Sequence, residues 1–131
     1  MKPIGLLLLL VVLAAGSVWG EVVEIPDPNL RAALEKALGK NEGDAITKED
    51  LAKITSIESQ EKAKIVSLTG LEYCTNLMSL DISNAKIIDL SPLSNLINLE
   101  SLSLGSNQIV DLTPLLNLTN LKHLNLLGIA N

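Results

Sequence analysis

The chain has 131 residues and combines a hydrophobic fraction of 47% with an aromatic fraction of only 2%, so its core must be aliphatic. Ten Lys and Arg residues against fifteen Asp and Glu residues give a formal net charge of −5. An acidic chain without a basic run is a poor ligand for nucleic acid, because phosphate binding needs clustered Lys or Arg. One cysteine and one histidine exclude an intrachain disulfide and a His-rich metal site, so no metal or cofactor is expected.

Residues 1–20 have the three-part layout of a secretory signal peptide. Lys2 gives a positive start, an uncharged apolar run follows over 4–15, and small residues lead up to Gly20. We expect cleavage after Gly20, with Gly16 as the alternative. The other interpretation is an uncleaved anchor, but this run is shorter than the ~20 apolar residues that a spanning helix needs. The leader predicts a secreted or cell-surface protein with no membrane insertion after cleavage.

Residues 21–54 are predicted to form a small helical cap. Asp27 followed by Pro28 is typical of a helix start, since the carboxylate accepts N–H groups of the first turn and proline fits the first helical position. Gly39 suits the left-handed residue that ends such a helix. Thr47 and Asp50 have capping-box spacing for a second short helix. The expected apolar positions are Leu30, Ala33, Leu34 and Leu38 in the first helix, and Leu51 and Ile54 in the second.

The polar bend between these helices has a second interpretation as a calcium loop. Its oxygen-bearing side chains are Asn41, Asp44, Thr47 and Asp50. If Ile46 is the eighth loop position, Gly39 falls where the first acidic ligand is required, and Asp44 falls where glycine is required. Helix capping explains the same residues, so it is the favoured hypothesis.

Residues 55–131 contain a repeat of 22 residues. Leu77–Asn98 and Leu99–Asn120 are identical at 11 of these 22 positions, and a partial copy starts at Leu121. A degenerate copy precedes them after a slip of one residue. In that copy Ile54 and Ile57 take the places of the first two leucines. A fixed period of this length indicates a solenoid, in which each copy makes one coil and stacked coils share a core.

Each full copy predicts one strand and one short helical turn. The spacing of Leu99, Leu102 and Leu104 includes a period of two, which is typical of a strand with alternate side chains inward. Thr113 is expected to cap a short helical or 3₁₀ turn that starts at Pro114. Stacking then lines up the strands as a parallel sheet on the concave side.

The repeats at 77–126 resemble the 22-residue leucine-rich repeats of internalin-type bacterial proteins. The segments 25–30, 46–51 and 68–73 resemble the N-terminal cap of secreted proteins in that family. The resemblance implies an α/β fold, a leucine-rich-repeat solenoid with short parallel strands on the concave face and a small helical N-terminal cap. It also implies a non-catalytic module that binds a protein partner, as yet unidentified, through that face.

The concave side chains follow from the repeat alignment. Its columns are Ser79/Ser101/His123, Asp81/Ser103/Asn125 and Ser83/Gly105/Leu127. The predicted partner-binding residues are Ser79, Asp81, Ser83, Ser101, Ser103, His123 and Asn125. These residues include no Trp, Tyr or Arg, the types that dominate binding hot spots. The alternative function is therefore a structural N-terminal spacer, or a truncated fragment of a longer cell-surface repeat protein.

Catalysis is not predicted. Cys74 occupies the inward column of Leu96 and Leu118, which indicates a core residue rather than a reactive thiol. His123 has no second histidine, and the spacing gives it no serine or cysteine partner, so general-base chemistry has little support.

The sequence also makes predictions about the bends after the strands and about the last coil. Asn107 is expected to bond neighbouring backbone groups, whereas Ala85 and Ile129 at the equivalent positions cannot. The last copy stops at its eleventh position, so its coil is expected to be uncapped at the C-terminal end. Leu121, Leu124, Leu126 and Ile129 would lie on this open terminal coil. Either the chain is a fragment of a longer protein, or it self-associates through this open coil.

Overall fold

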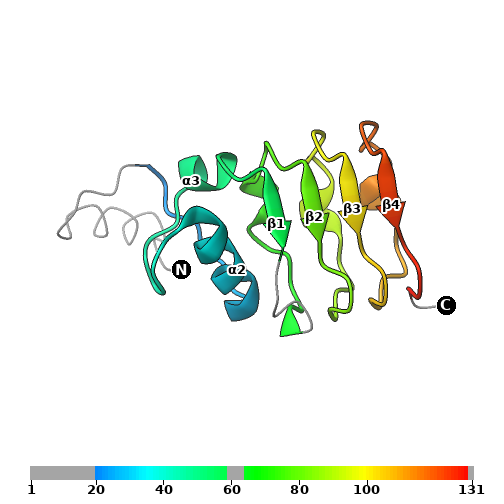
Figure 1. Cartoon of the computed structure of the whole chain (residues 1–131), viewed down its shortest axis with the longest axis horizontal. Coiled ribbons are helices and arrows are strands. Elements are labelled where there is room, and N and C mark those ends of the chain that lie inside the picture. The colour runs from blue at the N-terminus through cyan, green and yellow to red at the C-terminus, as the bar shows by residue number, and fades with distance from the viewer. Residues whose placement is uncertain (1–19, 59–63, 130–131) are drawn as a thin grey trace, which may run out of the picture.

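The computed structural model describes residues 20–58 and 64–129, so the predicted leader lies outside the described residues apart from Gly20. Two helices at the N-terminal end of this part lead into a row of coils, each of which adds one short strand to a parallel sheet (Figure 1). The predicted α/β leucine-rich-repeat solenoid is confirmed. Within the same ranges, none of the helices has the length and apolar character that crossing a membrane requires.

Helix α2 (Pro28–Leu38) begins and ends at the predicted residues. The Asp27 carboxylate accepts hydrogen bonds from the backbone N–H groups of Asn29 and Leu30 at 2.9 and 3.0 Å. Gly39 ends the helix in the left-handed conformation with a φ of 67°. Both ends of the helix are therefore satisfied, as the helix signals in the sequence require.

Helix α3 (Lys48–Ala52) opens with a complete capping box. The Thr47 hydroxyl accepts from the Asp50 N–H at 3.1 Å, and the Asp50 carboxylate accepts from the Thr47 N–H at 2.9 Å. The prediction that Ile54 lies on this helix is wrong, because the helix ends at Ala52. Ile54 is nevertheless buried, and the chain continues from it into the first strand.

In the described ranges, the sheet contains β1 (Ser56–Glu58), β2 (Ser79–Asp81), β3 (Ser101–Ser103) and β4 (His123–Asn125), in that spatial order. Leu80 pairs with Leu102, and Leu102 pairs with Leu124, as the repeat predicts. Ile57 pairs with Leu80, which confirms the slip of one residue in the degenerate copy. Neighbouring strands are thus successive coils, and every pairing is parallel.

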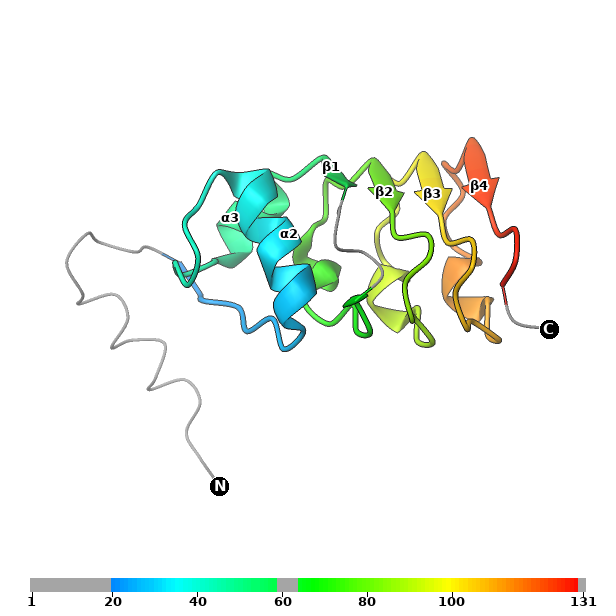
Figure 2. The same cartoon turned by 60° about the horizontal axis from the view of Figure 1, so that its bottom comes forward.

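Short 3₁₀ helices lie on the opposite side of the coils from the sheet, as Figure 2 shows. They are η2 (Leu71–Tyr73), η3 (Ser91–Leu93) and η4 (Thr113–Leu115). The prediction of Thr113 as the cap is wrong. Thr113 is the first residue of η4, and the Asp111 carboxylate accepts from both its N–H, at 2.9 Å, and its hydroxyl, at 2.7 Å. The residue at the cap position is therefore Leu112, one residue before the predicted cap, and Asp111 bonds to the first residue of the turn.

The core is one aliphatic cluster that extends from the cap through the coils, as the composition predicts. Leu30 and Leu34 of α2 and Leu51 of α3 are fully buried in it, together with the inward leucines of the repeats. Polar groups enter this interior mainly as caps and bends, where their hydrogen bonds are satisfied. The cap therefore covers the apolar edge of the first coil, the role that a terminal unit has in a solenoid.

Asn107 confirms the prediction for the bend after β3. It is 4% exposed, its carbonyl oxygen accepts from the Ile87 N–H at 2.9 Å, and its amide donates to the backbone oxygens of Ile82 and Leu104 at 2.8 and 2.9 Å. The side chain thus bonds its own coil and the coil before it. Ala85, at the equivalent position, is buried and has no polar side chain to offer.

Candidate functional site

Two rows of side chains cross the sheet on its concave face. The strand register aligns Ser79 with Ser101 and His123 in one row, and Asp81 with Ser103 and Asn125 in the other. These six residues alternate with the inward leucines Leu80, Leu102 and Leu124. The structure therefore brings the predicted residues of the two rows together on one face.

Ser83 lies just after β2 and is tied to the same face. The Asp81 carboxylate accepts from the Ser83 N–H at 3.0 Å and from its hydroxyl at 2.7 Å. In the last coil the Asn125 side-chain oxygen accepts from the Leu127 N–H at 3.0 Å. These bonds hold the Asp81 and Asn125 side chains of the second row in fixed positions.

The predicted rows are incomplete at their first strand. Ser56 pairs with Ser79, and Glu58 pairs with Asp81, so β1 adds one residue to each row. The slip of one residue in the repeat alignment places Ile57 opposite Leu80. The same alignment therefore places Ser56 and Glu58 in the two rows, so the sequence alone could have identified them. Beside them, Ala33, Lys36 and Ala37 of α2 form a groove with Ser56 and Glu58.

The charge of the face changes along the solenoid. Glu58 and Asp81 lie side by side across two parallel strands near the cap, whereas Ser103, Asn125 and His123 occupy the later strands. Like charges on neighbouring strands of a sheet repel each other, and a cationic group near both carboxylates reduces this repulsion. The two carboxylates of the face therefore lie near the cap, where Lys36 of α2 lines the same groove, and β4 contributes His123 and Asn125.

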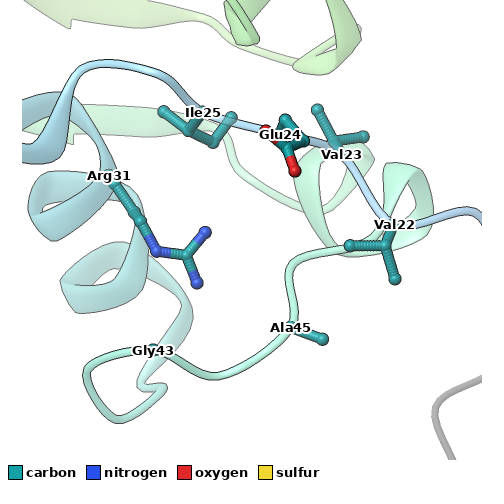
Figure 3. A pocket seen from close by; sticks show the side chains of 7 residues that line it. All are labelled: Val22, Val23, Glu24, Ile25, Arg31, Gly43 and Ala45. Carbon is teal, nitrogen blue, oxygen red and sulfur yellow. The ribbon is translucent and has the colours of Figure 1, made fainter. Parts of the chain in front are cut away.

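A pocket in the cap lies between the segment 22–25, helix α2 and the loop before α3, and it has a volume of about 340 Å³ (Figure 3). The Arg31 side chain extends into it, and Glu24 lines the facing side. The Arg31 guanidinium already contacts the Glu35 carboxylate at 3.3 Å and donates to the Asp44 backbone oxygen. With two acidic side chains near one arginine, this pocket has no net positive charge for an anion.

The polar bend that had the alternative interpretation as a calcium loop is held by internal bonds. The Asp44 carboxylate accepts from the Asn41 N–H at 2.9 Å, and Thr47 and Asp50 form the capping box of α3. Over the described ranges, no three His, Cys, Asp or Glu side chains come together in a way that could hold a metal ion.

Cys74 lies in the core, as predicted. It is 0% exposed, and burial, with a smaller contribution from the Glu72 charge, raises the pKa of its thiol to about 12. A thiol with so high a pKa stays protonated at neutral pH and is a weak nucleophile. The residue therefore acts as a small apolar side chain in its column.

A column of asparagines was not predicted as a structural feature. Asn76, Asn98 and Asn120 each donate from the side-chain amide to a backbone oxygen of the preceding coil or cap, at 2.7, 2.9 and 2.7 Å respectively. The acceptors are the carbonyl groups of Ala52, Thr75 and Ile97. The repeat alignment shows that these asparagines recur, but their partners depend on how the coils stack.

Comparison with known proteins gives no match to any protein-family model and none to a curated protein sequence. Solved structures do match. An internalin (InlF) from Listeria monocytogenes is 40% identical with a TM-score of 0.71, and the functional domain of InlJ from the same species is 34% identical with a TM-score of 0.66. The alignments cover 78% and 77% of this chain.

A structure of CBM51-2 and INT domains from Clostridium perfringens ZmpB is 30% identical with a TM-score of 0.62, over 72% of this chain. The chain spans only 30% of the InlF chain, 22% of the InlJ chain and 20% of the ZmpB chain. The similarity covers the cap as well as the coils, because the repeats alone are too short for such coverage. The repeat length, the N-terminal cap and the sequence identity all match the internalin structures. The chain is therefore an internalin-like leucine-rich-repeat protein.

Proposed function

We propose that the chain is a non-catalytic protein-binding module that docks a protein partner on the concave face of its sheet. The observation that carries this proposal is the register of the two polar rows across four hydrogen-bonded strands. The contact residues we propose are those predicted from the sequence, Ser79, Asp81, Ser83, Ser101, Ser103, His123 and Asn125, together with Ser56 and Glu58.

The physical basis is a rigid, shallow surface. Leu80 and Leu102 are each 1% exposed beneath the rows, so the strands cannot move independently of the core. The side chains above them are mostly small, which allows the backbone of a partner to approach closely. The bonds that Asp81 and Asn125 already accept keep the second row in place. A face of this kind gains affinity from preorganisation rather than from large anchors.

The charge of the face supports a partner that presents lysine or arginine toward Glu58 and Asp81. Opposite charges across an interface increase the association rate and fix the orientation of the partner. We propose that binding takes place outside the cytoplasm, at the cell surface or after secretion. The layout of residues 1–20 and the similarity to internalins support this location. The cap at 21–54 and the coils at 55–131 would then act as one binding unit.

The spacer function remains the second candidate. It is favoured by the absence of Trp, Tyr and Arg from the proposed contact residues and by the small share of the InlF and InlJ chains that this chain spans. In that case the coils would hold other parts of a longer surface protein at a distance. The two candidates differ in whether concave side chains affect an affinity.

Photocrosslinking separates these candidates. A benzophenone amino acid at Ser103 in the concave row is compared with the same amino acid at Asn95, an exposed residue next to η3. A partner protein that crosslinks from position 103 and not from position 95 is purified, and its affinity is measured against Ser101→Glu and Asp81→Lys. Binding weakened about tenfold or more by these changes supports the module, since hot-spot losses have this size. Equal crosslinking at both positions, or unchanged affinity, supports the spacer.

A further inference from the structure

A column of exposed apolar side chains lies on the coils, between the bends that follow the strands and the 3₁₀ helices. Val66, Ile88 and Val110 occupy equivalent repeat positions and are 57%, 57% and 76% exposed. The backbone beside them is hydrogen-bonded from coil to coil, since the Lys86 N–H donates to Ile65 and the Gln108 N–H donates to Ile87 at 3.0 and 3.1 Å. The three side chains therefore stack at roughly the 4.8 Å spacing of neighbouring strands. We call this column the apolar ridge.

Charges of opposite sign flank the apolar ridge. Lys86 precedes Ile88 in the chain, and Asp89 follows it; all three are exposed while Ile87 between them is buried. Lys86 lies two residues before Ile88 and Asp89 lies directly after it, so along the path of the coil the lysine and the aspartate lie on opposite sides of the ridge. The ridge therefore has a basic flank and an acidic flank.

The next coil continues the acidic flank. Asp111 follows Val110 as Asp89 follows Ile88, and both aspartates are exposed. Bonds donated by Ser91 lower the pKa of Asp89, and the negative charge of Asp111 opposes this shift. The two carboxylates therefore lie close enough to repel each other. An acidic column of this kind is stabilised by basic groups brought to it from outside.

We propose that this face joins two copies of the chain around a two-fold axis that runs along the apolar ridge. Rotation about this axis keeps each coil opposite the same coil and exchanges the two flanks. Lys86 of each copy then faces Asp89 of the other, and the two Ile88 side chains meet on the axis. A two-fold axis across the ridge would instead place Lys86 opposite Lys86 and the acidic columns opposite each other. The charge pattern therefore favours a second copy of the chain, with its coils in the same order along the ridge.

The expected dimer is weak. A ridge of three side chains gives an interface below the ~1,200 Å² that is typical of stable complexes. Ion pairs at a solvated rim fix orientation and association rate more than affinity, and salt screens them. We therefore expect a concentration-dependent dimer that dissociates further as the salt concentration rises. This surface is separate from the concave face, so partner binding and dimerisation can fail independently.

Sedimentation velocity of the purified protein at low salt tests the proposal. Lys86→Asp places an acidic side chain on each side of Ile88, and Asp89→Lys places a basic side chain on each side of it. Each variant alone is expected to self-associate about tenfold more weakly than the wild type, and an equimolar mixture is expected to form the dimer again. The controls are Lys53→Asp and Glu42→Lys, which carry the same charge changes at exposed residues away from this face. They are expected to leave the association unchanged.

Substitutions in the apolar residues locate the interface. Ile88→Asp is expected to abolish the dimer, whereas Leu127→Asp, on the coil of β4, is expected to leave it intact. The melting temperature of each variant confirms that it is folded. The proposal is overturned if the wild type stays monomeric at all concentrations, or if the mixture of charge variants does not associate. Loss of the dimer in Leu127→Asp but not in Ile88→Asp would assign self-association to the terminal coil and overturn it as well.

Discussion

Asn107 is a polar side chain that lies in an otherwise aliphatic interior, where each of its hydrogen bonds matters. Asn107→Leu keeps a similar volume but leaves the Ile87 N–H and the Ile82 carbonyl group without their partner. We expect the free energy of unfolding to fall by about 2–4 kcal/mol, since unpaired buried groups retain their desolvation cost. Urea denaturation followed by circular dichroism measures this change.

The matched control is Asn98→Leu. Asn98 is exposed and makes one bond, to the Thr75 carbonyl group, which water can replace when the amide is removed. Its expected cost is at most about 1 kcal/mol. Equal losses in the two variants would show that burial of the Asn107 bonds is not what stabilises the bend.

Asp27 connects the cap to the first coil. Burial raises the pKa of its carboxyl group, but bonds from the N–H groups of Val66, Leu30, Ser67 and Asn29 outweigh burial and leave the pKa below its ordinary value of 3.8. Two of these donors, Val66 and Ser67, lie on the first coil. The carboxylate therefore fastens α2 to the repeats as well as capping it.

This lowered pKa predicts a pH-dependent contribution to stability. A group with a lowered folded-state pKa stabilises the fold fully above its unfolded-state value and loses this effect as the pH falls toward the folded-state pKa. Asp27→Asn is therefore expected to be less stable than the wild type at pH 7, and the difference is expected to shrink below about pH 4. Urea midpoints from pH 7 to pH 2 measure it. A difference that stays constant over this range would contradict the role of the charge.

At the scale of elements, the turn before η2 departs from the repeat. Gly70 stands where Pro92 and Pro114 stand in the next two coils, but its φ is 107°. A Cβ at Gly70 would lie 2.3 Å from the Ile25 Cδ1 atom of the cap. The positive φ therefore favours glycine at this position, and any other residue would also make the end of the Ile25 side chain shift.

Gly70→Pro restores the repeat sequence and is nevertheless expected to destabilise the fold by more than about 3 kcal/mol. Proline cannot adopt a positive φ, and it removes the N–H that Gly70 donates to the Glu72 carboxylate. Pro92→Gly, the reverse change in the next coil, is expected to cost only about 1 kcal/mol through unfolded-state entropy. Thermal unfolding of both variants tests the contrast. A stabilised Gly70→Pro variant would refute it.

The sequence predicts the elements well where a residue acts within its own coil. The leucine spacing defines β2 and β3, and the signals at Asp27 and Thr47 define the starts of α2 and α3, because these interactions span only a few residues. The prediction fails where two short-range signals compete. Thr113 is a residue type that often caps helices, but its N–H and hydroxyl groups donate to the Asp111 carboxylate instead. It also misses roles that depend on another coil, such as the bonds of Asp27 to Val66. Of the candidate site, Ser56 and Glu58 were missed because the shift in register was not applied to the face.

At the scale of the molecule, equivalent leucines of neighbouring strands differ in how deeply they are buried. Leu102 is 1% exposed in the middle of the sheet, and Leu124 is 46% exposed on β4. Leu102→Ala is expected to lower the free energy of unfolding by about 2–5 kcal/mol, and Leu124→Ala by less than about 1 kcal/mol. Urea denaturation measures both. Similar losses would mean that the outer coil is as tightly packed as the inner one.

The bonds of Asn76, Asn98 and Asn120 all have the same direction along the chain. Each donor is on a later segment, and each acceptor is on the segment before it. A coil can therefore complete this contact as soon as it has been synthesised, without waiting for any residue downstream. During translation from the N-terminus, each new coil would then add to coils that have already folded. The inward leucines of a nascent coil would therefore be exposed to solvent only briefly.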